Sequence, residues 1–317
     1  MTASRGGGHN GGVRRVVFTM VGVQAAIVIV FLALVFTGVI GSLGSAGEEV
    51  DGARAAASRA DRFDERRAFA TLREQVALGP RPAGSPASRA LAERLRARLP
   101  RARFQPVPGG LQNVIGSVPG RDPRRTVIVG AHYDTKDAPG FVGANDGASG
   151  TAAVLELARG LRPRSIRPTV VFMFFDGEES PADAAEFEFE EKGLRGSKVA
   201  AAQAARAPRR PEAMILLDFV GDRDLSIPRE GNSDERLWAR LRSAAGRVGA
   251  GRAFPASILR GEISDDHLPF IAAGIPSIDL IDFTFPCFHR RCDDLSAVSP
   301  RSLDQAGEAV AEMLRTL

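Results

Sequence analysis

The stretch VVFMFFDGEE at residues 170–179 decides the fold class. Six apolar residues are followed directly by Asp176, Gly177 and the pair Glu178 and Glu179. An uninterrupted apolar run of this length is typical of a strand that is buried on both faces of a sheet. Neighbouring carboxylates are costly at the end of a buried strand unless a positive charge compensates them. Ligands of open α/β sheets bind at that end, so the acidic residues are either part of a site or an acidic surface turn, and the polar motifs elsewhere in the chain favour a site.

The composition is that of a soluble globular domain with a tail. Of the 317 residues, 44% are hydrophobic and 25% are charged, which is ordinary for a domain large enough to enclose a core. The net charge is +4 and the pI is near 9.6. The basic residues are nearly all arginines, scattered among Ala and Glu without interleaved aromatic residues. The sequence therefore does not favour nucleic-acid binding.

The N-terminal region predicts a membrane anchor. A Gly-rich basic tail at residues 1–15 precedes an apolar run at residues 16–40, which is long enough to cross a bilayer. Arg14 and Arg15 lie before this run, so the positive-inside rule places the N-terminus in the cytoplasm and the remainder outside. A linker at 41–60 would follow. The alternative is a cleaved signal peptide, with secretion of the product; both interpretations export residues 61–317.

Residues 61–317 are expected to form one catalytic domain in which strands and helices alternate. Strands are predicted at 112–118, 126–129, 169–175, 213–220, near Ile258 and at 277–281. Helices are predicted at 62–78, 86–99, 147–161, 197–206, 234–248 and 300–317. This alternation indicates an α/β fold with a mostly parallel mixed sheet and helices on both faces.

Polar side chains suited to chemistry gather in five places, four of them where an apolar run gives way to a polar turn. These places contain His132, Asp146, the pair Glu178 and Glu179, Asp218 and, within residues 263–294, Asp265, Asp266, His267 and His289. Each residue alone has a structural explanation, such as a core histidine, a helix cap or a turn at the end of a strand. Imidazole and carboxylate are the ligands that zinc takes when thiolates are absent. Their joint placement predicts a site for one or two zinc ions.

Several motifs carry a family resemblance. They are HYD, VGANDGASG, FFDGEE, GLRGS, LLDFVG, DDHLPF, GIPSIDLI and FPCFHRRCDD, together with the early GPRPAGSPAS. In this order and spacing they resemble the zinc-dependent exopeptidase superfamily, which contains bacterial zinc aminopeptidases and glutaminyl-peptide cyclotransferases. The resemblance covers residues 62–317. The motif FFDGEE, the doubled Asp265-Asp266 and LIDFTFP are more similar to the cyclotransferases.

The resemblance implies a set of metal ligands. Asp146, Glu179 and His289 would hold one zinc ion. His132 and Asp218 match ligands of a second metal in the aminopeptidases, where Asp146 would bridge the two ions. The cyclotransferases retain these residue types yet work with one metal, so one ion is expected and two remain open.

The resemblance also implies catalytic roles. Glu178 would carry protons, and Asp218 and Asp265 would hydrogen-bond around the reacting amide. Phe288 stands where animal cyclotransferases have a tryptophan, so the pocket walls are expected to differ. The cysteines that flank His289, Cys287 and Cys292, would join as a disulfide in an exported protein or remain free.

Three functions follow from these patterns, in decreasing order of support. The first is cyclisation of N-terminal glutamine to pyroglutamate with loss of ammonia, in which the substrate's own amine attacks and proximity supplies much of the acceleration. The second is hydrolysis of N-terminal residues by an aminopeptidase, with Glu178 activating a water. The third is a non-catalytic binding module, which the presence of Glu178 beside Glu179 disfavours.

Overall fold

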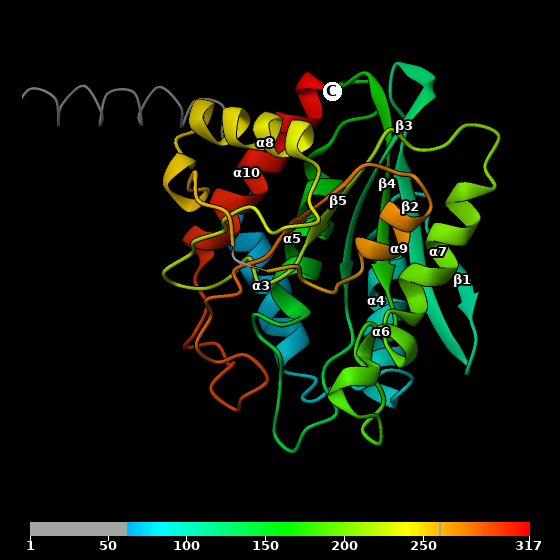
Figure 1. Ribbon diagram of the computed structural model, residues 1–317, viewed down its shortest axis with the longest axis vertical. Coiled ribbons are helices and arrows are strands. Elements are labelled where there is room, and N and C mark those ends of the chain that lie inside the picture. Colours follow the sequence, from blue (N-terminus) through cyan, green and yellow to red (C-terminus); the bar gives the residue numbers. More distant parts are fainter. Residues whose placement is uncertain (1–61, 260) are drawn as a thin grey trace, which may run out of the picture. The chain divides into compact units, whose positions relative to one another are not determined.

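A computed structural model describes residues 62–259 and 261–317 (Figure 1). The predicted tail, membrane span and linker, residues 1–60, lie outside these ranges and stay predictions. Among the helices of the described ranges, none combines the length and the apolar character needed to cross a membrane.

A six-stranded mixed sheet forms the centre of the domain, in the order β1-β2-β4-β3-β5-β6. Strands β4, β3, β5 and β6 are parallel to one another, whereas β1 and β2 form an antiparallel edge. The strand bounds are β1 Arg103–Val107, β2 Leu111–Val118, β3 Asp122–His132, β4 Pro168–Phe175, β5 Ala213–Leu217 and β6 Ser277–Leu280. The expected mostly parallel mixed sheet is confirmed.

Helices cover both faces of this sheet. One face carries α3 Glu65–Val76, α4 Pro86–Arg98, α5 Ala148–Gly160, α8 Glu235–Arg247 and α10 Pro300–Thr316. The other carries α7 Arg195–Ala205 and α9 Leu268–Ala272. Three short helical segments complete the described part of the chain: η2 Glu186–Glu188, α6 Phe189–Lys192 and η3 Gly251–Ala253.

The apolar stretch at residues 170–175 is buried on both sides of the sheet, as predicted. In β4, Phe172 and Phe174 enter the core beneath α3, α5 and α10, while Met173 and Phe175 enter the core beneath α7 and α9. Alternation of side chains across a strand requires apolar residues at every position when both faces are covered. The strand therefore sits near the centre of the sheet, between β2 and β3.

The structure differs from the strands predicted from the sequence at three places. The strand predicted near Ile258 is wrong, because that residue makes only an isolated bridge with Arg229. The strand predicted at 213–220 ends at Leu217, so Asp218 already lies beyond the sheet. Edge strand β1 was missed; it contains Pro106, and proline within an apolar run argues against a strand except at an edge.

Candidate metal centre and active site

The carboxyl ends of three adjacent parallel strands supply most of the candidate residues. His132 is the last residue of β3 and pairs in register with Phe175, the last residue of β4. Glu178 and Glu179 follow β4 within a few residues, and Asp218 directly follows β5. Parallel strands place their carboxyl ends at one edge of the sheet, so these side chains converge there.

A tight turn brings Asp146 to the same edge. Gly147 precedes helix α5 and adopts φ +87°, a left-handed conformation that favours glycine. A Cβ added to Gly147 would lie 2.6 Å from the carbonyl oxygen of Asp134. Only glycine therefore allows the turn to pack against the end of β3 while Asp146 points into the site.

The three predicted ligands of one zinc ion come together. His289 Nε2 lies 3.1 Å from Glu179 Oε1 and 3.4 Å from Asp146 Oδ2. One ligand atom from each of these residues lies within 4.8 Å of the others. We call Asp146, Glu179 and His289 the outer group, because His289 is the most exposed member.

A second set of three adjoins the first and shares Asp146 with it. His132 Nε2 lies 3.3 Å from both Asp146 Oδ1 and Asp218 Oδ1. All three residues are buried. We call His132, Asp146 and Asp218 the inner group.

The donor atoms of the outer group fit a zinc ion. One nitrogen and two carboxylates are a familiar zinc donor set that leaves a position open for water or substrate. Asp146 Oδ2 and both carboxylate oxygens of Glu179 are buried, and no backbone N–H or hydroxyl group of the described residues donates to them; Asp146 Oδ2 and Glu179 Oε1 face only the His289 imidazole. Unsatisfied buried carboxylate oxygens are costly without a cation. The only described ammonium or guanidinium that forms an ion pair with Glu179 is that of Lys136, whose Nζ lies 3.1 Å from Oε2.

Glu178 lies beside the outer group without belonging to it. Its Oε2 is 3.9 Å from His132 Nδ1. Burial raises the pKa of the Glu178 carboxyl well above its usual range, and the negative charges of Glu179 and Asp265 add to this effect against the opposing charge of His132. In contrast, the hydrogen bond and the charge of His289 lower the pKa of Glu179 although its burial acts the other way. Neighbouring carboxyls with opposite pKa shifts can take different roles, one as a ligand and one as a proton carrier.

Two further carboxylates hold the ligand loops through the backbone. Asp134 accepts the N–H groups of Glu178 and Glu179, each at 3.2 Å. Asp293 accepts the N–H groups of Asn145 at 2.6 Å and Asp146 at 3.0 Å. These bonds fix the direction in which each ligand carboxylate leaves the main chain.

Arg81 holds the Asp146 loop from its other side. It is fully buried and donates to the carbonyl oxygens of Val142 and Gly143. Burial lowers the pKa of its guanidinium to about 10, although the charges of Asp146 and Asp293 act against this shift. The loop is thereby fixed at its carbonyl groups as well as at its amides.

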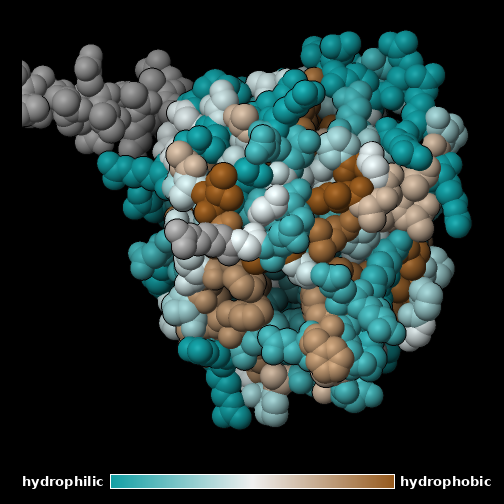
Figure 2. Space-filling view, in the orientation of Figure 1, coloured by the Kyte–Doolittle hydropathy of each residue, from teal (hydrophilic) through white to brown (hydrophobic). Residues whose placement is uncertain are grey.

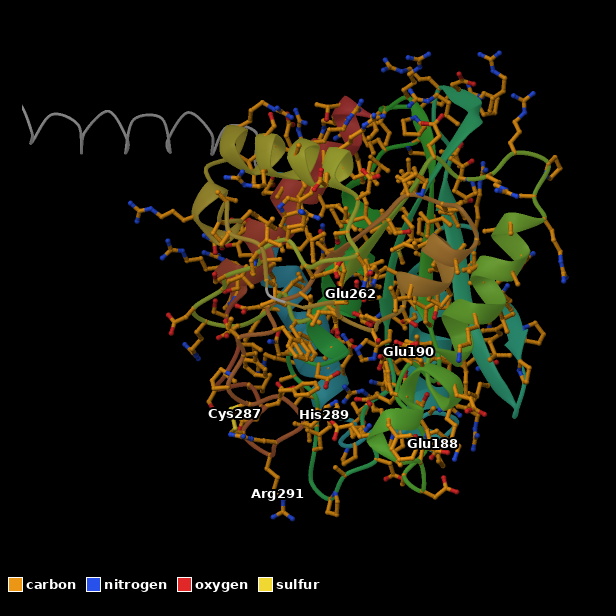
Figure 3. All side chains as sticks on the ribbon, in the orientation of Figure 1. Glu188, Glu190, Glu262, Cys287, His289 and Arg291 are labelled. Carbon is orange, nitrogen blue, oxygen red and sulfur yellow. A yellow bond between two sulfur atoms is a disulfide. The ribbon has the colours of Figure 1, made fainter. Side chains whose placement is uncertain are left out.

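The site opens into a cavity of about 720 Å³. Its floor includes the outer group, Glu178, Asp218 and Asp265. Phe219, Phe283 and Phe288 form part of its wall, with ring centroids 5.1 to 6.3 Å apart. Figure 2 shows the hollow on this face of the molecule with apolar side chains along its margin. Figure 3 places His289 on one side of the hollow and Glu188 and Glu190 on the other.

The family model described as peptidase family M28 matches residues 113–314. The chain belongs to peptidase family M28. Every strand from β3 to β6 and all residues of both ligand groups lie within the matched range.

Relatives of this M28 chain carry two kinds of name. A glutaminyl-peptide cyclotransferase of Boiga dendrophila is 30% identical over 206 residues, covering 51% of this chain and 54% of that protein. The chain thus spans about half the length of the curated cyclotransferase that it matches. A glutaminyl cyclase structure from an Acidobacteriales bacterium is 29% identical, with TM-score 0.68 and coverage of 80% and 94%. A leucine aminopeptidase precursor structure from Bacteroides thetaiotaomicron VPI-5482 is 27% identical, with TM-score 0.71 and coverage of 80% and 98%.

A third polar cluster lies next to the floor of the cavity. One ligand atom from each of Asp265, His267 and Asp279 lies within 4.8 Å of the others, and all three residues are buried. His267 Nε2 also faces Glu230 Oε1 at 3.4 Å. Asp265 belongs both to this cluster and to the cavity lining. The cluster is therefore continuous with the carboxylates of the M28 site.

Several residues of the M28 site were not singled out from the sequence. Asp134 and Lys136 follow His132 closely, and the HYD motif was the available signal for Asp134. Asp293 follows Cys292 in the quoted FPCFHRRCDD, but nothing in that motif shows which backbone groups its carboxylate accepts. Arg81 lies in the quoted GPRPAGSPAS, where the pattern indicated only a turn.

Proposed function

We propose that the chain is a zinc-dependent enzyme acting on peptide N-termini, and that its reaction is the cyclisation of N-terminal glutamine. The observation that carries this proposal is the placement of Glu178 on the floor of the cavity, next in sequence to Glu179 of the outer group and facing His132 of the inner group. Relatives named glutaminyl-peptide cyclotransferase and glutaminyl cyclase support the choice of reaction.

Asp146, Glu179 and His289 would hold one zinc ion. When bound there, the ion would act as a Lewis acid toward the γ-carbonyl oxygen of the substrate glutamine. The remaining steps depend on the side chains of the chain itself.

Glu178 moves the proton in this scheme. The substrate's α-amine nitrogen forms a bond to Cδ of its own glutamine side chain, and the bond from Cδ to the amide nitrogen breaks. The carboxylate of Glu178 accepts a proton from the amine and gives it to the departing nitrogen, which leaves as ammonia. A carboxyl whose pKa is raised by burial is suited to both acceptance and return of a proton near neutral pH.

Asp218 and Asp265 orient the reacting amide. Both are buried residues of the cavity floor. Burial raises the pKa of Asp218 to about 7, so a protonated fraction is available near neutral pH to donate a hydrogen bond to an amide oxygen. Asp265 supplies a second such partner beside it. Holding the γ-amide in one orientation brings the α-amine into an attacking position.

Aminopeptidase action is the second candidate, and two observations favour it. The inner group supplies the residue types of a second metal site, and the neighbouring structures include a leucine aminopeptidase precursor. In that reaction Glu178 would take a proton from a water instead of from the substrate's amine.

The proposal extends to cellular placement. Residues 16–40 anchor the protein in the lipid bilayer, and the catalytic domain lies outside the cytoplasm; the alternative is secretion after signal cleavage. The disulfide between Cys287 and Cys292 supports an extracytoplasmic position, because disulfides persist mainly in oxidising compartments.

A paired assay separates the two reactions. The purified zinc-loaded chain is incubated with a peptide that begins with Gln and with an aminoacyl chromogenic amide, and ammonia and free amino acid are measured. Ammonia release with pyroglutamyl product supports cyclisation, and a free amino acid without ammonia supports the aminopeptidase. Glu178→Gln should abolish whichever activity is found; unchanged turnover in this variant would contradict both candidates.

A further inference from the structure

One short segment, residues 287–293, touches the outer group at two points. His289 supplies the imidazole that faces Glu179 and Asp146. Four residues later, buried Asp293 accepts the backbone N–H of Asn145 and of Asp146. The segment therefore affects two of the three expected zinc ligands.

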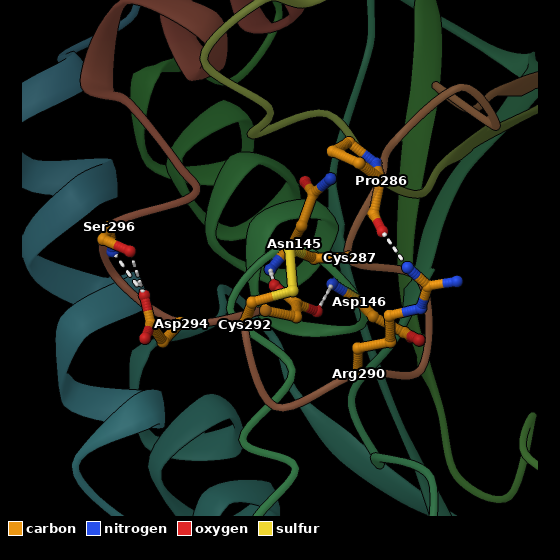
Figure 4. The surroundings of a disulfide bond; sticks show 9 residues. Asn145, Asp146, Pro286, Cys287, Arg290, Cys292, Asp294 and Ser296 are labelled. Atoms are coloured by element: carbon orange, nitrogen blue, oxygen red, sulfur yellow. Dashed lines mark hydrogen bonds between the residues drawn. A yellow bond between two sulfur atoms is a disulfide. The ribbon is translucent and has the colours of Figure 1, made fainter.

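A disulfide closes this segment around His289. Cys287 and Cys292, which are five positions apart in sequence, are joined, with their Cα atoms 5.4 Å apart (Figure 4). Inside the loop, Arg290 N–H donates to the Cys287 carbonyl at 2.9 Å, and Asp293 N–H donates to the Arg290 carbonyl at 3.0 Å. Outside the loop, Arg291 Nε donates to the Pro139 carbonyl at 2.9 Å, and the Phe288 ring packs against the rings of Phe219 and Phe283.

His289 needs this restraint because of its backbone conformation. Its φ is +52°, in the left-handed region that residues other than glycine seldom adopt. A backbone conformation of this kind persists only where contacts with the surrounding structure hold it in place. Arg290 and Arg291 beside it are exposed, so the loop is restrained by the covalent link together with the ring contacts of Phe288 and of His289 itself.

We propose that the Cys287–Cys292 disulfide is a positioning device for the ligand His289, and that reduction of this disulfide lowers zinc affinity and so switches the site off. Cys292 is exposed and Cys287 is half-buried, so a dithiol in solution reaches the bond. The dithiol gives two electrons and two protons, the bond between the two sulfur atoms breaks to two thiols, and the reductant becomes its own disulfide.

The physical basis is conformational entropy. With the link intact, the loop holds its bound shape before zinc arrives, so binding does not have to order it. Without the link, each freed residue must be ordered again when the ion binds. Loss of comparable supporting contacts around metal ligands costs about 10- to 100-fold in affinity, and we expect a change of this size.

The test measures zinc affinity on the full chain by competition with a chromogenic chelator, without any substrate. The samples are the oxidised protein, the protein reduced with dithiothreitol and freed of reagent under argon, and the double variant Cys287→Ser, Cys292→Ser. Weaker zinc binding by about 10- to 100-fold is expected in both altered samples, with reoxidation restoring the first. Equal affinity within about twofold would overturn the proposal, as would an oxidised protein that binds no zinc.

Two controls separate positioning from general stability. The reductant should not change the zinc affinity of the double serine variant, which has no disulfide to reduce. In a His289→Ala background, opening the loop should alter zinc affinity much less, because the ligand that the loop positions is gone. An undiminished effect there would show that the loop does not act through His289. Should the serine variant fail to fold, the reduced wild-type chain still gives the answer.

This inference rests on the proposed zinc site but not on the reaction performed there. A protein that weakens its zinc binding on reduction yet releases no ammonia keeps the disulfide role and loses the cyclase assignment. The reverse result, ammonia release with unchanged zinc affinity on reduction, keeps the cyclase and rejects the disulfide role.

Discussion

The outer and inner groups share Asp146 but receive their histidines in different ways. His289 comes from a loop, and its side chain is 30% exposed on the wall of a cavity. His132 comes from the end of β3, and its side chain is 1% exposed. The outer group can therefore exchange water for substrate at an open position, whereas the inner group reaches the cavity through Asp146 and Asp218 but not through its histidine.

The two groups also differ in how their charges are compensated. Although burial opposes protonation of His132, the negative charge of Asp218 and hydrogen bonds with the surrounding carboxylates raise its pKa well above the usual range. A charged His132 then lies between Asp146 and Asp218 and compensates both. In the outer group, Glu179 faces Lys136 and the partly exposed His289, while Asp146 must share the charge of His132 with Asp218. We therefore expect the outer group to require the ion and the inner group to persist without one.

A matched pair of carboxylate variants gives the largest expected contrast. Glu179→Gln removes a ligand of the outer group only, and we expect loss of bound zinc with activity falling by at least about 10³-fold. Asp218→Asn is an isosteric change of the same kind in the inner group. We expect this variant to keep about one zinc ion per chain. Metal analysis after dialysis distinguishes the two, and equal zinc loss in both would show that the groups act as one two-metal site.

Removal of the proton carrier should leave the metal in place. Glu178→Gln is expected to lower kcat by about 10²- to 10⁴-fold, the usual contribution of a positioned acid or base, while zinc content stays unchanged. The control is Glu262→Gln on the cavity rim, which should keep activity within about twofold. Zinc loss in Glu178→Gln would place Glu178 among the ligands instead.

A smaller effect is expected from the carboxylate that supports the glutamates. Asp134→Asn replaces the acceptor of the Glu178 and Glu179 N–H groups with a neutral amide. We expect zinc affinity to fall by about 10- to 100-fold with little change in far-UV circular dichroism. Chelator competition measures the change; an affinity equal to that of wild type would mean that the outer group is positioned without Asp134.

The smallest expected effect is a change in the Tm of the zinc-free protein with pH. Burial raises the pKa values of Asp218 and Asp293 to about 7, above that of an unfolded aspartate near 3.9. Between these values the folded state binds more protons than the unfolded state, so stability falls as pH rises. We expect the Tm measured in chelator to be lower at pH 8 than at pH 5.5 by roughly 2–6 °C, since 1 kcal/mol corresponds to about 2–4 °C in a domain of this size.

Two comparisons sharpen this last prediction. Asp218→Asn cannot ionise at that position, so its Tm should depend less on pH over the same range. Added zinc should reduce the pH dependence as well, because the bound ion compensates the carboxylates of the site. A Tm that rises from pH 5.5 to pH 8 in the zinc-free wild type would contradict the assigned directions.

The local sequence pattern was sufficient to predict most helices and strands of the described domain. The apolar run in β4 and the start of helix α4 at Pro86 were found because each depends on neighbours in sequence. Strand β1 was missed because its pairing with β2, across an edge, decides its conformation more than its own residues do. The extent of β3, which continues to His132, was underestimated for the same reason.

The sequence by itself determined that histidine and acidic residues follow buried parallel strands, since apolar runs and their polar ends are local features. Only the tertiary structure decided which of them share a space: it separated an outer group from an inner one, brought Glu178 beside His132, and linked Asp293 to the backbone of Asp146. The physical reason is that ligand geometry depends on contacts between residues far apart in sequence, such as Asp146 and His289, and those distances are fixed by packing of the whole sheet.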